Sequence, residues 1–145
     1  MKNIKLFISI FGLIMISGVL ISFMSIGNEN DETIVVMGYY VPEKDYHPEK
    51  LPLEQLTHII FSFTNVIDGE MKFRDADTGE KLHQLVAQRK NHPHLKVMIA
   101  CGGWGADGFS DMAHTAKNRK KFITSVLAFN TKYELDGIDI DWEYP

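Results

Sequence analysis

The sequence predicts an α/β fold whose strands are parallel and covered by helices. Four short runs of β-branched and aromatic residues are apolar on both faces, as is typical of strands buried on both sides of a sheet. The segments between them are long enough for crossover connections, and two of these segments carry apolar residues at helical spacing. The predicted strands cover residues 33–37, 57–64, 95–100 and 137–142.

The connections in the first half of the chain are predicted to be mostly irregular. The first strand leads into a loop at 38–40, and the connection 41–56 contains three prolines, with a helical turn around 53–56 as its only regular part. The second strand is followed by an excursion over 65–78. Its Asp68-Gly69 pair is a turn signal, so we expect a hairpin there.

The second half contains the two predicted helices. Apolar residues recur at helical spacing over 79–91, and an Asn-His-Pro sequence ends this helix. A second helix is predicted over 116–133, where four aromatic and aliphatic residues form one face. The loop after the third strand, residues 101–105, reads Cys-Gly-Gly-Trp-Gly.

The N-terminal residues 1–27 resemble an export signal. Lys2 and Lys5 form a short basic start, residues 6–26 are almost entirely apolar, and small residues follow. The apolar run is long for a cleaved signal, so a membrane anchor stays open as an alternative. Residues 28–32 are a polar linker, and the protein is expected to be secreted, periplasmic or held at the cell envelope.

Charge and cysteine content narrow the possible partners. The chain has 15 basic and 19 acidic residues, and without Lys2 and Lys5 its net charge falls from −4 to −6. Such a surface repels phosphate backbones, so nucleic acid is not an expected partner. The single Cys101 cannot form an internal disulfide, so packing must supply the stability.

The last predicted strand combines two interleaved rows of side chains. Asp139, Asp141 and Glu143 occur at every second position with apolar residues between them, so the three carboxylates are predicted to share one face of the strand. The other face would pack on helices; it consists of Ile138, Ile140 and Trp142. Such a strand fits the wall of a (β/α)8 barrel, where one face meets the axis and the other the helices. We therefore expect a partial TIM barrel, its first four parallel strands with crossover helices.

Crowded carboxylates are suited to acid catalysis. Mutual repulsion and desolvation raise carboxyl pKa values, so at least one of the three groups is expected to hold a proton at neutral pH. A glycosidase needs such a group to protonate the leaving oxygen, and Glu143 is the best candidate because it is the longest and lies nearest the carboxyl end. Asp136 is out of phase and is predicted to be structural. A calcium loop or a solvated acidic turn are the alternatives, but Ile and Trp between the acids fit neither well.

Residues 136–145 read Asp-Gly-Ile-Asp-Ile-Asp-Trp-Glu-Tyr-Pro, which resembles the D-x-x-D-x-D-x-E signature of glycoside hydrolase family 18, the chitinases. Segments 38–40, 56–63 and 96–104 are similar to the first three strand regions of that family, in the same order. The resemblance covers nearly all of residues 33–145. It implies retaining hydrolysis of β-1,4-linked N-acetylglucosamine polymers such as chitin, with no metal or cofactor.

The resemblance also implies roles for individual residues. The substrate's own acetamido oxygen would attack the anomeric carbon, an exception to the two-carboxylate scheme. Glu143 would protonate the leaving oxygen and later activate water, Asp141 would orient the acetamido group, and Asp139 would share a proton with Asp141. Further residues are expected to line the substrate site or to support the motif. The lining residues are Tyr39, Phe63, Gly102, Gly103, Trp104 and Tyr144, and the supporting residues are Asp136 and Gly137.

Two features depart from the family pattern. Ala100 stands where the family usually has a serine that supports the inner aspartate, which puts the tuning of Asp139 in doubt. A complete barrel typically needs about 250 residues, so residues 33–145 are expected to be its N-terminal half and inactive alone. An endo-β-N-acetylglucosaminidase and a non-catalytic chitin-binding lectin of the same fold are the alternative functions.

Overall fold

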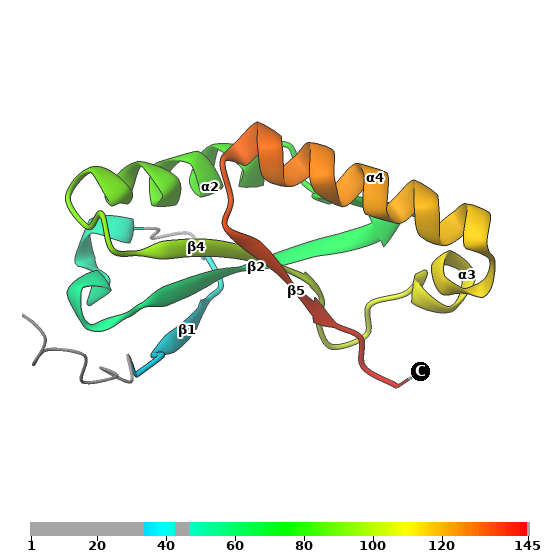
Figure 1. Ribbon diagram of the computed structural model, residues 1–145, viewed down its shortest axis with the longest axis horizontal. Helices are drawn as coiled ribbons and strands as arrows, with labels where there is room; N and C mark the ends of the chain where they lie inside the picture. The colour runs from blue at the N-terminus through cyan, green and yellow to red at the C-terminus, as the bar shows by residue number, and fades with distance from the viewer. Residues whose placement is uncertain (1–33, 43–46, 145) are drawn as a thin grey trace, which may run out of the picture. The chain divides into compact units, whose positions relative to one another are not determined.

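The computed structural model describes residues 34–42 and 47–144 (Figure 1). The predicted signal or anchor at 1–27 and the linker at 28–32 lie outside these residues. Within the described part of the chain, no helix is both long and apolar enough to cross a membrane. Residues 35–145 form one compact unit, and the fold below is that of this unit.

The centre of the unit is a parallel sheet with strand order β1-β2-β4-β5. Its strands are β1 (Met37–Tyr40), β2 (His58–Ile67), β4 (Lys96–Gly102) and β5 (Gly137–Asp141). Its helices are α2 (Thr78–Val86), α3 (Phe109–His114) and α4 (Ala116–Tyr133), with short 3-10 helices at Pro48–Lys50, Leu53–Gln55 and Ala87–Lys90. Helix α2 connects β2 to β4, and α3 and α4 connect β4 to β5, so α2 and α4 cover the same side of the sheet (Figure 1). The predicted α/β class with parallel strands and crossover helices is confirmed.

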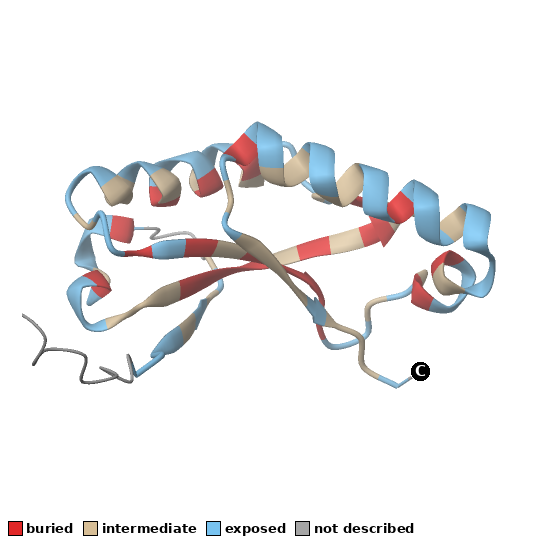
Figure 2. Cartoon of the chain, viewed as in Figure 1, coloured by how far each residue is buried: buried red, intermediate tan, exposed pale blue. Residues whose placement is uncertain are grey.

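The two faces of the sheet have different packing partners. Alternate residues of β2 and β4 enter the main core under the helices; they are Ile59, Phe61, Val97, Ile99 and Cys101. Ile60 and Ala100 are also buried, yet they lie outside this cluster and point to the opposite face. Figure 2 shows the buried residues concentrated along β2, β4 and the inward sides of the helices. The opposite face is therefore the one available for a site.

The predicted hairpin in 65–78 is present. β2 continues to Ile67 and is followed by a two-residue turn, Asp68-Gly69, in which both residues have positive φ. β3 (Glu70–Lys72) then pairs antiparallel with the end of β2. Asp and Gly tolerate the left-handed conformation that such a turn requires. The second strand is consequently longer than the predicted 57–64.

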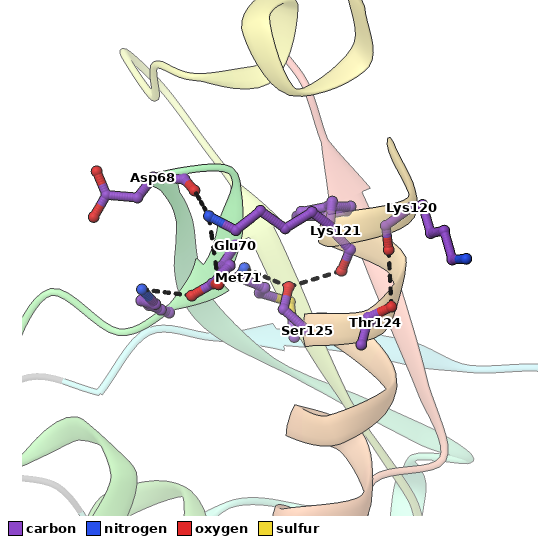
Figure 3. A network of polar contacts seen from close by, with 9 residues as sticks. Asp68, Glu70, Met71, Lys120, Lys121, Thr124 and Ser125 are labelled. Atoms are coloured by element: carbon purple, nitrogen blue, oxygen red, sulfur yellow. Dashed lines mark hydrogen bonds and ion pairs between the residues drawn. The ribbon is translucent and has the colours of Figure 1, made fainter. Parts of the chain in front are cut away.

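Polar contacts fix this hairpin to α4 (Figure 3). The Met71 backbone N–H donates to Ser125 Oγ at 2.9 Å, and Lys121 Nζ donates to the Asp68 carbonyl oxygen at 2.5 Å. Lys121 also lies 3.5 Å from the Glu70 carboxylate. The hairpin and the start of α4 therefore form one rigid rim at the carboxyl end of the sheet.

Three expectations about the elements need correction. The first strand covers Met37–Tyr40 and not 33–37, because its ladder to β2 begins at Met37 opposite His58, while residues 34–36 are exposed. Helix α3 was not expected, since a six-residue helix carries too little periodicity to detect. The predicted helix over 79–91 is α2 followed by a tighter 3-10 turn, whereas the helix over 116–133 is confirmed at both ends.

Candidate active site

The acidic strand β5 places two of the three carboxylates on the same face. Asp139 pairs with Ala100 and Asp141 with Gly102 of β4, and residues two apart in a strand point the same way. The regular strand ends at Asp141, so strand alternation does not determine the direction of Glu143. The other face of β5 is only partly covered: Ile138 packs against the core, whereas Ile140 is 47% exposed because β5 has no second neighbouring strand among the described residues.

Tyr39 of β1 reaches across the sheet to Asp139. Its hydroxyl donates a hydrogen bond to Asp139 Oδ2 at 3.0 Å. This hydrogen bond raises the pKa of the Tyr39 phenol, and the negative charges of Asp139 and Asp141 raise it further. The contact joins the first and last strands of the sheet, and the sequence alone did not reveal it because the two residues lie 100 positions apart.

Gly102 and Gly103 form a tight turn at the end of β4. Both have positive φ, at 126° and 92°. A Cβ atom at Gly102 would lie 2.0 Å from the Asp141 carbonyl oxygen, and that same oxygen accepts a hydrogen bond from the Gly103 N–H at 3.0 Å. The Phe63 ring packs on Gly103, where an added Cβ would lie 3.2 Å from it. Only glycine lets this loop press against the end of β5, which fixes the backbone position of Asp141.

Glu143 lies in a hollow beside the loop that follows β4. The hollow has a volume of about 490 Å³ and is lined by residues 105–111 and by Trp142, Glu143 and Tyr144. Trp142 forms its floor by stacking on Phe109 of α3, with ring centroids 5.5 Å apart. Glu143 is half-buried there, so its carboxyl group is open to a ligand at the carboxyl end of the strands.

Two exposed aromatic side chains stand beside this hollow. Trp104 is 82% and Tyr144 is 78% exposed, and their rings meet edge to face with centroids 5.6 Å apart. Large aromatic rings left in water on this rim provide flat apolar surfaces, which are suited to stacking on a sugar ring. Tyr39, which is 61% exposed, is a third exposed aromatic residue, and it contacts Asp139.

Asp136 lies at the opposite end of β5, as predicted for a structural residue. Its Oδ2 accepts hydrogen bonds from the Val97 N–H at 2.8 Å and from Arg89 Nη2 at 2.5 Å, and Lys96 Nζ lies 3.2 Å from Oδ1. Burial raises the pKa of this carboxyl, but the hydrogen bonds from Val97 and Lys96 and the charge of Arg89 outweigh burial, and the pKa is lowered overall. The neighbouring Gly137 lets Met98 pack closely, since a Cβ there would lie 3.1 Å from its terminal methyl.

Sequence reasoning missed one polar group on the site face. Ser62 is 2% exposed, and its hydroxyl oxygen has no hydrogen-bond partner among the described residues. Ser62 pairs with Ala100, which in turn pairs with Asp139. A serine inside an apolar strand gave no signal, because its importance depends on the register. Cys101, as expected, faces away from this row and lies in the helix-side core.

The calcium loop and the solvated acidic turn were the two alternatives for the acidic strand. No three His, Cys, Asp or Glu side chains in 34–42 and 47–144 are arranged to hold a metal ion. The strand geometry also argues against a solvated acidic turn, because Asp139 and Asp141 stand in a regular parallel strand and are both half-buried.

Parallel strands with polar side chains at their carboxyl ends are the arrangement in which barrel enzymes hold their active sites. The family model for glycosyl hydrolases family 18 matches residues 35–145, and the chain belongs to this family. The resemblance inferred from the acidic signature is thereby confirmed.

Named relatives agree with this assignment. The chain is 38% identical over 107 residues to an endochitinase of Manduca sexta, covering 69% of this chain and 19% of the relative. It is 32% identical over 102 residues to chitotriosidase-1 of Mus musculus, covering 69% of this chain and 22% of that relative. Among solved structures, the chitinase domain of the spore coat protein CotE from Clostridium difficile superposes with a TM-score of 0.69 at 38% identity, covering 81% of this chain and 33% of that one. The chain thus spans about a fifth of these curated relatives and a third of the solved domain.

Proposed function

We propose that this chain carries the catalytic acid of a chitinase-type glycoside hydrolase that cleaves β-1,4-linked N-acetylglucosamine polymers. The observation that carries the proposal is the placement of Asp139 and Asp141 on the open face of a parallel strand, with the Tyr39 hydroxyl bound to Asp139. Membership of family 18 and the names of the relatives, which are chitinases, support the choice of substrate.

The proposed reaction is retaining and uses the substrate's acetamido group as nucleophile. Glu143 donates its proton to the glycosidic oxygen while the acetamido oxygen bonds to the anomeric carbon and the glycosidic bond breaks. The Glu143 carboxylate then takes a proton from water, whose oxygen opens the oxazolinium ring at the anomeric carbon. Asp141 holds the acetamido group and offsets the positive charge on the ring, and Asp139 shares a proton with Asp141.

The aromatic side chains have a binding role in this proposal. Trp104 and Tyr144 present exposed ring faces beside the hollow that contains Glu143, and sugar rings would stack on them. Phe63 supports the site indirectly by packing on the Gly103 turn. The ligand is uncharged, which is compatible with the acidic character of the chain.

The 145-residue chain by itself is proposed to bind chito-oligosaccharides weakly and not to cleave them. The solved CotE chitinase domain is about three times as long as the part of it that superposes on this chain, and we expect its remaining strands to complete the barrel. A hybrid in which residues 35–145 replace the matching segment of the CotE chitinase domain supplies those strands and allows turnover to be measured.

Turnover of chito-oligosaccharides by this hybrid tests the proposal. Glu143→Gln is expected to lower kcat by about 10²–10⁴-fold, since it removes the general acid. Glu80→Gln is the matched control, because Glu80 is exposed on α2 and lies outside the hollow that contains Glu143; it should leave kcat unchanged. Full activity in Glu143→Gln would sink the hydrolase assignment.

Two other functions share this part of the fold. An endo-β-N-acetylglucosaminidase would prefer N-linked glycans to chitin oligomers in the same assay. A non-catalytic lectin would bind without cleaving. Human YKL-39, a pseudo-chitinase with retained chitooligosaccharide binding properties, shares the fold with a TM-score of 0.67. The presence of Glu143 at the signature's last position favours the hydrolase.

A further inference from the structure

Ser62 is a buried hydroxyl without an assigned partner. It and Thr64 are the two buried polar residues of the described chain, and they behave differently. Thr64 Oγ1 donates to the Ala100 carbonyl oxygen at 3.0 Å, whereas Ser62 Oγ has no hydrogen-bond partner among the described residues. A buried hydroxyl that lacks a hydrogen bond costs folding free energy, so its retention calls for an acceptor within reach.

The register of the sheet identifies the acceptors on the same face. Ser62 of β2 pairs with Ala100 of β4, and Ala100 pairs with Asp139 of β5. Paired residues of parallel strands point to the same side of the sheet. The other residues of these strands on that face near Ser62 are Ile60 and Met98, which have no oxygen. The carboxylates of β5 and the Tyr39 hydroxyl are therefore the polar side chains that strand geometry directs toward Ser62.

The Tyr39 contact draws the Asp139 carboxylate over the inner face of the sheet. Tyr39 stands on β1 and Asp139 on β5, with β2 and β4 between them. A hydrogen bond of 3.0 Å between their side chains must therefore pass over β2 and β4. Tyr39 is paired with Ile60, two positions before Ser62 on β2. The Asp139 carboxylate is therefore directed toward the part of β2 that contains Ile60 and Ser62.

Ala100 leaves this row open. Its methyl group stands between Ser62 and Asp139 and neither donates nor accepts a hydrogen bond. A larger side chain at this position would separate the two groups, and a hydroxyl there would bind Asp139 itself. Alanine is too small to block an approach of the Ser62 hydroxyl to the Asp139 carboxylate, which the proposal below requires.

We propose that Ser62 is a positioning residue, whose hydroxyl is the second donor to the Asp139 carboxylate beside Tyr39. Two donors on neighbouring strands would fix the carboxylate in one orientation over the sheet. The role of Ser62 in catalysis rests on the proposed function: it would hold Asp139 in place for proton exchange with Asp141. The contact itself does not depend on that function.

A double-mutant cycle on the full chain tests the contact through stability, with no substrate. If Ser62 binds Asp139, then Ser62→Ala lowers the urea midpoint in the wild type, and this shift disappears in the Asp139→Ala background. Thr64→Val is the matched control, since it removes a neighbouring buried hydroxyl whose acceptor is a backbone oxygen. Its shift should be equal in both backgrounds. A neutral or stabilising Ser62→Ala, or equal shifts in both backgrounds, would overturn the proposal.

Phenol titration gives a second readout that a purely structural serine would not move. Without Ser62, the Asp139 carboxylate accepts only from Tyr39, so the pKa of the Tyr39 phenol should rise further above its wild-type value. Phenolate absorbance, taken as the difference from a Tyr39→Phe variant, measures this change. Should Ser62→Ala fail to fold, Ser62→Cys keeps the volume with a weaker donor and should raise the same pKa. An unchanged Tyr39 titration in the folded variant contradicts the proposal.

Discussion

The contacts of Asp136 allow a quantitative test of how the chain aligns β5. The perturbation is Asp136→Asn, with Asp136→Ala as the larger change. Two hydrogen bonds join Asp136 to Val97: the Asp136 N–H donates to the Val97 carbonyl at 2.9 Å, and the Val97 N–H donates to the Asp136 carboxylate at 2.8 Å. Arg89 binds both this carboxylate and the Glu134 carbonyl oxygen. The carboxylate thus fixes the start of β5 to β4 and to the turn after α2.

The magnitude follows from these contacts. A hydrogen bond to a charged group contributes about 1.5–3 kcal/mol to stability, and a buried donor left without an acceptor costs a further 1–3 kcal/mol, roughly. The Asp136 and Arg89 side chains are 27% and 25% exposed, so this pair keeps most of its value. Lys96 is 57% exposed and should contribute less than about 1 kcal/mol. We expect Asp136→Asn, which keeps an acceptor for Val97, to cost about 1–2 kcal/mol, and Asp136→Ala about 3 kcal/mol.

The effect should also depend on pH. The pKa of Asp136 is lowered from its ordinary 3.8, because the contacts with Val97, Lys96 and Arg89 outweigh burial. A lowered folded-state pKa means that the carboxylate stabilises the fold above the unfolded-state pKa and stops doing so as the pH falls through the folded-state value. The stability difference between wild type and Asp136→Asn should therefore be constant near neutral pH and close in acid, below 3.8.

Urea unfolding followed by circular dichroism, repeated from neutral to acid pH, measures the loss of unfolding free energy and its dependence on pH. Asp75→Asn is the control, because Asp75 is exposed; it should change the free energy of unfolding by less than about 0.5 kcal/mol. If Asp136→Asn is as stable as the wild type, or if the difference persists unchanged into strong acid, the carboxylate is not what aligns β5.

Three further predictions concern the glycine turn, the thiol and the tyrosine. Gly102→Ala should lower the free energy of unfolding by at least about 3 kcal/mol, because the new methyl group meets the β5 backbone. Gly105→Ala should lower it by only about 1 kcal/mol, because Gly105 has a φ of 70° but open space around it. Equal urea midpoints for the two variants would contradict this. Burial raises the pKa of the Cys101 thiol to about 11, so a thiol reagent should label the chain only after unfolding; rapid labelling of native protein is the contrary result. Asp139→Asn should lower the pKa of Tyr39 toward its ordinary 10.0, read by phenolate absorbance, and an unmoved titration would dismiss the contact.

The order and type of the main elements could be predicted because they depend on local patterns. The helix over 116–133 was found at both ends, since its apolar residues follow helical spacing over its whole length. The first strand was misplaced because apolar character alone does not define a strand. Its ladder begins at Met37, where β2 becomes available as a partner, and Ile34 is 80% exposed although its neighbours are β-branched.

Part of the candidate site could be predicted in the same way. Asp139 and Asp141 follow from strand alternation, and Gly102 from the need for a turn. The direction of Glu143 could not be derived by alternation, since the regular strand ends before it. The Tyr39–Asp139 hydrogen bond and the Ser62 row depend on how β1, β2 and β4 align, and a register is a tertiary property that no local pattern in this sequence contains.

The register also explains why the acids lie beside small residues. Asp139 stands opposite Ala100 and Asp141 opposite Gly102, so β4 offers no bulky side chain next to either carboxylate. Large inward residues would fill the volume in front of the carboxylates and dehydrate them without a ligand, which costs free energy unless the charge is paired. Small residues there leave space that water can occupy and that, under the proposed function, a sugar would fill. The core-facing residues of β4, Ile99 among them, can be large because the helices cover them permanently.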